Sequence, residues 1–178
     1  MGLDMIFRPA MAHELDGVMA IIEDGRASLA RLGIDQWQGS TPNESMVRDD
    51  MAAGRTMVAV DDDGRLLGTL AFMSTVEPDY SNITWGSWLF DGCDYATLHR
   101  VAVAADAARA GVGTFMVQSS KEKAASLGMK SMRVDTHEGN IPMQRLLESC
   151  GLTHCCDVDI TLPEEQTRKR LGYEILLS

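Results

Sequence analysis

The sequence lacks the features that would assign it to a membrane-spanning or nucleic-acid-binding class. It has no signal peptide and no apolar run long enough to cross a bilayer, so we expect a cytoplasmic protein with no membrane partner. Lys and Arg total 16 against 26 Asp and Glu, which gives a net charge of −10. Because basic side chains supply most of the affinity for nucleic acid, this balance predicts no nucleic-acid partner.

Cysteine is scarce, and its spacing does not suit a metal. No Cys-x-x-Cys pair occurs among the four cysteines, Cys93, Cys150, Cys155 and Cys156. His154 precedes two of them, but neighbouring residues of a strand point to opposite faces, so these side chains should not converge. We therefore expect no metal ion and free thiols, as is usual in a reducing compartment.

What is present suits one globular domain spanning residues 1–178. Hydrophobic residues make up 45% of the 178 residues, enough for a sizeable core. The acidic balance favours solubility in the first place, and it also mildly favours a cationic substrate through electrostatic steering.

The most informative stretch combines a strand, a glycine turn and a helix. A strand pattern ends at Val103, and the segment from Arg109 to Thr114 leads into a helical pattern that ends near Leu127. A helix start carries unpaired N–H groups, which glycines leave accessible to a bulky anion. This segment therefore predicts a pyrophosphate site. The segment has neither the lysine of a Walker A loop nor the third glycine of the dinucleotide fingerprint, so it matches neither of those two phosphate-binding motifs.

The same stretch resembles motif A of the Gcn5-related N-acetyltransferase (GNAT) superfamily, Gln/Arg-x-x-Gly-x-Gly/Ala after a Val-Ala-Val-like strand. Here the motif falls on Ala108 to Gly113, with Ala108 in place of the Gln or Arg and Ala105 where proline is common. The resemblance implies acetyl-CoA as cosubstrate. It also implies a set of cofactor-binding residues: Val101, Ala102, Val103, Arg109, Ala110, Gly111, Val112, Gly113, Thr114 and Asn140.

Periodicity along the chain predicts the remaining elements. We expect helices over 12–32, 41–54, 111–127 and 140–150, and strands over 4–9, 56–60, 66–75, 95–103, 131–136, 152–162 and 171–177. Residues 76–94 are rich in aromatics but show no period. This order matches the GNAT fold, an α/β (α+β) class with a mixed, splayed sheet of about seven strands flanked by about four helices.

The resemblance also suggests catalytic positions. Asp135 aligns with a position that is a glutamate base in some family members, whereas Leu147 stands where the family's tyrosine general acid is usual. We therefore predict Asp135 as the base and consider Tyr173, on the last strand, as a proton donor. Other candidates for the base are Glu77, His99, His137 and Glu138. His99 has an ordinary pKa suited to proton transfer, but we expect it to be a buried structural histidine. Four residues from irregular segments are candidates for acceptor binding: Trp37, Glu77, Tyr80 and Trp85.

The resemblance implies an enzyme that transfers the acetyl group of acetyl-CoA to a primary amine of a small molecule or peptide, by direct attack with general-base help. The alternative is a GNAT-like domain that binds acyl-CoA as a sensor or interaction module without catalysis. Ala108 and Leu147 keep this alternative open. The sequence also leaves open whether the protein forms a homodimer.

Overall fold

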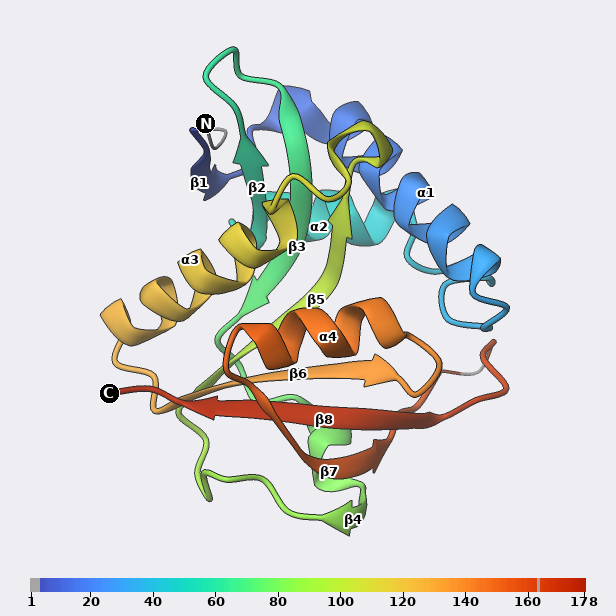
Figure 1. The fold of residues 1–178 in the computed structure, drawn as a ribbon, viewed down its shortest axis with the longest axis vertical. Helices are drawn as coiled ribbons and strands as arrows, with labels where there is room; N and C mark the ends of the chain where they lie inside the picture. The colour runs from blue at the N-terminus through green and yellow to red at the C-terminus, as the bar shows by residue number, and fades with distance from the viewer. Residues whose placement is uncertain (1–3, 163) are drawn as a thin grey trace.

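The computed structural model describes residues 4–162 and 164–178 (Figure 1). Its helices are α1 (Leu15–Arg31), α2 (Glu44–Ala52), α3 (Val112–Ser126) and α4 (Ile141–Ser149), with short 3-10 turns η1 (Ala12–Glu14), η2 (Pro78–Ser81) and η3 (Ala105–Ala107). Its strands are β1 (Ile6–Pro9), β2 (Thr56–Val60), β3 (Leu66–Met73), β4 (Ile83–Gly86), β5 (Tyr95–Val103), β6 (Ser131–His137), β7 (Thr153–Asp159) and β8 (Lys169–Leu176).

All the strands join one mixed sheet in the order β1-β2-β3-β5-β6-β8-β7-β4. Neighbours are antiparallel except β5 and β6, which run parallel. The predicted fold class is confirmed, with eight strands in place of about seven. The additional strand, β4, lies in the segment that showed no period, and it pairs with β7 at the edge of the sheet.

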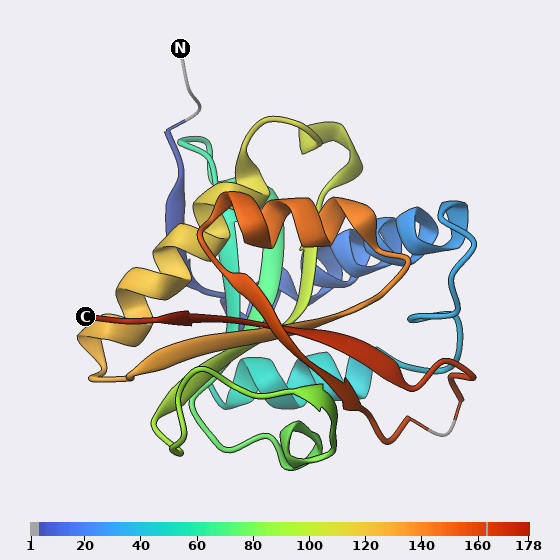
Figure 2. The same cartoon turned by 60° about the horizontal axis from the view of Figure 1, so that its bottom comes forward.

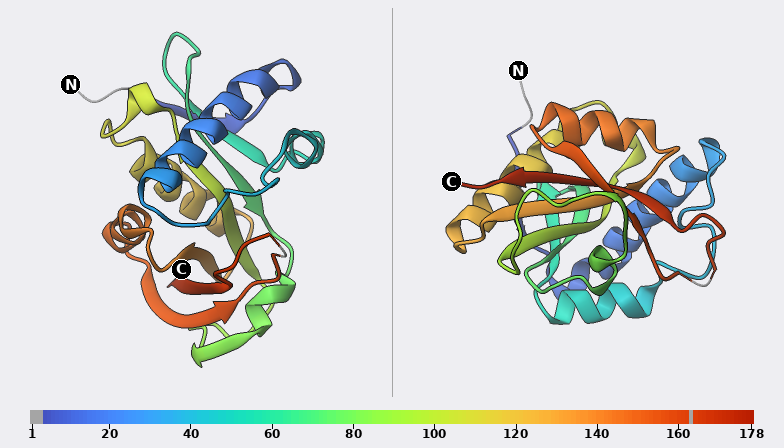
Figure 3. Two further views of the ribbon diagram at one scale, coloured as in Figure 1. Left: turned by 90° about the vertical axis from the view of Figure 1, so that its right-hand side faces the viewer. Right: turned by 90° about the horizontal axis from the view of Figure 1, so that it is seen from below.

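Helices cover both faces of the sheet, α3 and α4 one face and α1 and α2 the other (Figures 1 and 3). Alternation along β2 explains this arrangement, since Met57 and Ala59 belong to the core that includes α3 residues, whereas Val58 and Val60 pack with residues of α1 and α2. No helix in the part of the chain described is long and apolar enough to cross a membrane.

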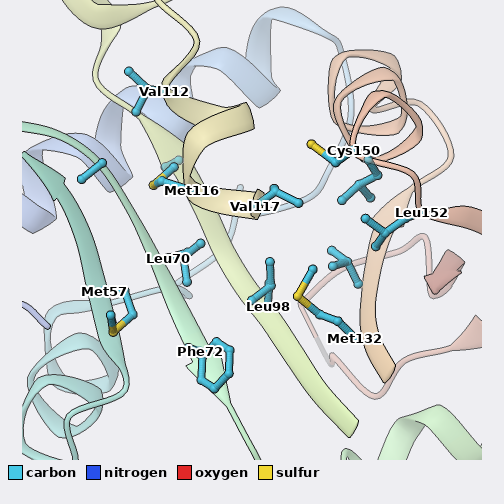
Figure 4. Close-up of a cluster of buried hydrophobic side chains, with 14 of the residues drawn as sticks. Met57, Leu70, Phe72, Leu98, Val112, Met116, Val117, Met132, Cys150 and Leu152 are labelled. Carbon is cyan, nitrogen blue, oxygen red and sulfur yellow. The ribbon is translucent and has the colours of Figure 1, made fainter. Parts of the chain in front are cut away.

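The main core joins the two halves of the sheet beneath α3. Val117 of α3, Leu98 of β5 and Met132 of β6 lie together in Figure 4, and none is more than 1% exposed. Because Leu98 and Met132 come from the two strands of the parallel pair, the core holds β5 and β6 together at one end.

Two glycines define the start of α3. Gly111 has φ +82°, a left-handed conformation that glycine adopts without steric cost, and it occupies the N-cap. Phe115 N makes the first helical bond, to Gly111 O at 3.0 Å, so the preceding amides are left without helical partners. At Gly113, an added Cβ would lie 3.0 Å from Leu146 Cδ2, so this glycine permits the close approach of α4.

The parallel pair opens into a V. Only Tyr95–Thr97 of β5 and Ser131–Arg133 of β6 pair with each other. Beyond these residues, β5 remains paired with β3 and β6 remains paired with β8. A β-bulge in β5 helps to bend this strand away from β6. Thr69 of β3 pairs with Ala102 and Ala71 pairs with His99, so one residue of β3 lies opposite two residues of β5. Arg100, inside the bulge, has φ +53°. Figure 2 shows the two strands diverging below α4.

Candidate active site

The V between β5 and β6 opens into a cavity of about 590 Å³. One wall is formed by the bulged part of β5, and the opposite wall by the end of β6 with the start of α4. The rest is lined by the C-terminal half of α1, by the segment between α1 and α2, and by the segment between β7 and β8. Eight of the residues predicted from sequence line it: Val101, Ala102, Val103, Asn140, Asp135, Trp37, Glu77 and Tyr80.

The end of the cavity nearest α3 is lined mainly by small and apolar groups. One side is formed by the end of β5, at Val101, Ala102 and Val103. The lining continues toward α3 through Ala105 and Ala108. Across from them, Asn140 lines the cavity while its Oδ1 accepts a hydrogen bond from Met143 N at 3.3 Å and so caps α4. This end of the cavity, the channel, offers backbone groups and a mainly apolar lining.

The predicted pyrophosphate segment continues from this end. Arg109 has φ +63° and leads through Gly111 into α3, whose first amides carry the positive end of the helix dipole. The segment from Arg109 to Thr114 does not itself line the cavity; the lining stops at Ala108, directly before it. An extended ligand could thus run from the cavity onto the helix start, with its anionic part at the amides.

The opposite end is polar and carries a connected network. Tyr80 OH donates to Asp135 Oδ1 at 2.7 Å, and Asp135 Oδ2 lies 4.0 Å from Nε of Arg170. The Arg170 guanidinium, 1% exposed, also pairs with Glu165. Burial, reinforced by the charge of Asp135, raises the pKa of Tyr80 well above its usual range. The phenol therefore remains a hydrogen-bond donor at neutral pH.

A histidine and a carboxylate form a second pair beside this network. His99 Nε2 lies 3.2 Å from Glu77 Oε2, at an angle that gives an ion-pair contact without a well-aligned hydrogen bond. Burial alone would lower the pKa of His99, but the neighbouring carboxylates of Glu77 and Asp135 outweigh it and raise the pKa above its ordinary value. Both members of the pair line the cavity.

Trp37 enters the cavity from the segment between α1 and α2. Its φ of +65° is rare for a bulky residue, and its backbone is fixed on both sides. Trp37 N donates to Glu165 Oε1 at 3.2 Å, and Trp37 O accepts from the Arg26 guanidinium. The indole lies against α1 at Gly25, where an added Cβ would meet Trp37 Cζ3 at 2.8 Å. This unusual backbone conformation is thus held by specific contacts.

Two predicted site residues lie away from the cavity. Tyr173 is 1% exposed in the main core, where its OH donates to Glu148 Oε1 at 3.2 Å, and burial together with that carboxylate raises its pKa to about 12. Trp85 is 58% exposed on β4 and stacks on His154, with ring centroids 5.4 Å apart. Their positions do not favour the roles predicted for them.

Leu147 is fully buried in the core, so α4 supplies no phenol where the family's tyrosine is usual. The phenol in the cavity comes instead from Tyr80 of η2. Sequence reasoning missed Glu165 and Arg170, which complete the polar end. They lie in a polar segment with no motif around them, and only their tertiary contacts distinguish them.

The part of the chain that the structure describes contains no cluster of three His, Cys, Asp or Glu side chains arranged to hold a metal ion. The cavity combines an apolar channel at one end with a polar chamber at the other, and the chamber contains the phenol of Tyr80 and the carboxylates of Glu77 and Asp135.

Comparison with known proteins bears directly on this arrangement. The sequence profile of the acetyltransferase (GNAT) family matches residues 26–152, and no curated protein is significantly similar to the chain. A GNAT-family acetyltransferase structure from Streptococcus agalactiae has 31% identity and a TM-score of 0.86, with 99% of each chain covered.

Two more distant structures share the fold. The ribosomal-protein-S18-alanine N-acetyltransferase of Escherichia coli is 14% identical, with a TM-score of 0.67 over 98% of this chain and 95% of its own. The structure of yncA from Salmonella typhimurium, which contains its cofactor acetyl-CoA, is 15% identical, with a TM-score of 0.69 over 98% of this chain and 94% of its own. The profile match and the likeness to the streptococcal protein, together with the splayed sheet, place this chain in the GNAT acetyltransferase family.

Proposed function

We propose that this protein is an acetyl-CoA-dependent N-acetyltransferase whose acceptor is a primary amine of a small molecule or peptide. The observation that carries the proposal is the cavity itself, which leads from Ala108, just before the segment that starts α3, along β5 to a chamber containing carboxylates. An acetyltransferase needs a channel for a long thioester cosubstrate, and it needs a separate chamber for the acceptor.

The residues present fit acetyl-CoA. The free amides at the start of α3, with Arg109 and Thr114 beside them, would hold the pyrophosphate. The absence of a Cβ at Gly113 lets α4 pack close to that site. Val101 to Val103 would lie along the pantetheine arm, and a backbone amide of this strand would stabilise the developing oxyanion. Bound acetyl-CoA supplies an activated thioester.

The acceptor chamber favours a cation. Glu77, Asp79, Asp135 and Glu165 line it, and the buried Arg170 is already paired with two of these carboxylates. An alkyl ammonium is attracted to such a chamber, whereas an anionic acceptor would meet uncompensated negative charge. Apolar side chains complete its walls and suit a hydrocarbon portion: Met46, Met73, Ile160 and Leu162.

The amine must lose a proton before it attacks. An alkyl ammonium with a pKa near 10.4 is rarely neutral at pH 7, so a group of the chain has to accept that proton. Asp135, the base expected from the sequence, lies in the chamber and remains a candidate, but both of its oxygens already have partners. Tyr80 stays protonated and donates its hydroxyl proton to Asp135, so it holds that carboxylate in place and is not itself the proton acceptor.

The proposal is tested by thiol release from acetyl-CoA with a panel of amines of matched size. We expect turnover with cationic small amines or with peptides that have a free amino terminus. We expect little turnover with small amines that carry a carboxylate or a phosphinate. Mass spectrometry of the product should locate the acetyl group on nitrogen. If acetyl-CoA binds and no amine in a broad panel is acetylated, the sensor alternative replaces this proposal; the buried Leu147 is the observation in its favour.

A further inference from the structure

We propose that His99, oriented by Glu77, is the residue that accepts the proton of the acceptor ammonium. The inference rests on the proposed function and assigns its proton acceptor. It differs from the sequence-based expectation, in which His99 was a candidate but Asp135 was preferred as the base. Three observations carry it: the position of His99 on the bulged strand, the orientation of its ring, and the engagement of Asp135 elsewhere.

The β-bulge in β5 determines the position of His99. His99 is the last residue of β5 in regular register with β3 before the bulge, at the point where β5 leaves β6. Its side chain lines the cavity and is 23% exposed. The next residue, Arg100, turns its guanidinium to Asp50 of α2, so that cation is neutralised away from the imidazole. His99 is thus presented where the channel meets the acceptor chamber.

The ring orientation leaves one nitrogen for the substrate. Nε2 is buried and lies 3.2 Å from Glu77 Oε2, which favours the tautomer with its proton on Nε2. Because Nε2 is the nitrogen beside Glu77, the other ring nitrogen, Nδ1, is the one left to accept a proton, and no hydrogen bond within residues 4–162 and 164–178 engages it. Glu77 is itself held in place, because its backbone N donates to Tyr95 OH at 2.9 Å. A carboxylate that orients a histidine is a recurring arrangement for proton transfer.

The competing base is less suited to this step. Asp135 accepts the Tyr80 hydroxyl and faces Arg170, so its role is to hold those groups. Ordinary histidine and aspartate side chains differ in pKa by about 2.6, which makes an imidazole on the order of 400-fold more effective in the equilibrium that removes an ammonium proton. The neighbouring carboxylates strengthen this preference, because they stabilise the imidazolium once it forms.

The step balances without any further reagent. The ammonium transfers one proton to Nδ1 of His99, and the nitrogen lone pair that this frees attacks the thioester carbonyl carbon. The carbon–sulfur bond then breaks, and the thiolate leaves with its electron pair. The nitrogen gives its second proton to the thiolate, which leaves a neutral amide and a free thiol. The imidazolium proton passes to solvent, which regenerates neutral His99.

The test combines pH–rate profiles with an NMR titration of the His99 ring in the full chain. Because the base must be neutral, wild-type kcat/KM should rise with pH through the pKa of His99, above the ordinary value near 6.5. Two carboxylates and one phenol face this ring. They come from Glu77 at the N-cap of η2, Asp135 of β6, and Tyr80 of η2. Glu77→Gln removes one of those charges, so both the acid limb and the titration should move to lower pH.

His99→Gln should lower kcat/KM by about 10²-fold or more and abolish the acid limb, with the melting temperature little changed. The matched control is His154→Gln, since His154 Nε2 also pairs with a carboxylate, Asp157 Oδ1 at 2.7 Å, but lies outside the cavity. It should leave the profile and the His99 titration unaltered. A histidine with only a packing role would show no shift of the acid limb in Glu77→Gln.

The inference is overturned if wild type turns over an amine and His99→Gln retains its rate and acid limb. It is equally overturned if Asp135→Asn alone removes the limb, which would restore Asp135 as the base. If wild type binds acetyl-CoA but acetylates no amine, the proposed function fails and the inference fails with it. An unshifted His99 titration in Glu77→Gln would contradict the pairing independently of any activity.

Discussion

Gly111→Glu should weaken CoA binding while leaving the fold intact. Gly111 has φ +82° and no atom within 4 Å of an added Cβ, so the side chain has room and only the backbone is strained. That strain costs about 1–2 kcal/mol of stability, which for a chain of this length lowers the melting temperature by roughly 2–8 °C. The introduced carboxylate would stand beside the free amides of α3.

The electrostatic effect can be bounded. At about 6 Å from a doubly charged pyrophosphate, a carboxylate is repelled by about 1.4 kcal/mol at an effective dielectric constant near 80 and by about 5.5 kcal/mol near 20. Salt at physiological concentration, with a Debye length near 8 Å, roughly halves both values. We therefore expect a rise in Kd of about 3- to 100-fold, with a greater effect at low salt.

Two controls separate charge from strain. Gly111→Ala introduces the same backbone strain without a charge, and Gly128→Glu introduces the same charge at a glycine with φ +77° and open space at the far end of α3. Calorimetric titration with CoA at two salt concentrations should show weakened binding in Gly111→Glu alone. Equal affinity of Gly111→Glu and Gly128→Glu would refute the assignment of the pyrophosphate to this helix.

Further predictions concern the polar chamber. Arg170→Met should destabilise the protein by about 3–5 kcal/mol in urea unfolding, because it leaves buried Glu165 without its cation; a loss below about 1 kcal/mol would contradict this account. Tyr80→Phe should reduce kcat/KM and stability, the latter by about 1 kcal/mol, through loss of the Asp135 hydrogen bond. Tyr173→Phe, with its hydroxyl on Glu148, should preserve kcat/KM; a loss larger than that of Tyr80→Phe would restore Tyr173 as the donor.

The parts of the fold that depend on local pattern could be predicted from sequence. The strand, glycine turn and helix from Tyr95 to Ser126 follow from β-branched residues, a glycine at the cap and an apolar helical face, all within a short stretch. β4 could not be predicted in this way, because all four of its residues are exposed. Its strand conformation depends on backbone pairing with β7, which follows about seventy residues later.

The channel was predictable and the chamber was only partly so. Val101 and Asn140 were predicted because they match two separate motifs of the family, whereas the chamber is assembled by contacts such as that of Trp37 with Glu165, 128 residues apart. The assignment of Tyr173 was based only on its residue type and strand. Alternation within β8 then decided its location, since its register partner on β6 is Val134, whose side chain belongs to the main core.

The contacts between residues 35–40 and residues 164–167, at the polar end of the cavity, have a consequence for redesign. Besides the bond between Trp37 and Glu165, Glu164 accepts from Ser40 N at 2.6 Å, and Asp35 accepts from Thr167 N at 2.8 Å. Residues 35–40 and 164–167 therefore form one structural unit made from two distant parts of the gene. A loop exchanged alone would lose its counterpart, so a transplanted acceptor preference requires both segments to be moved together.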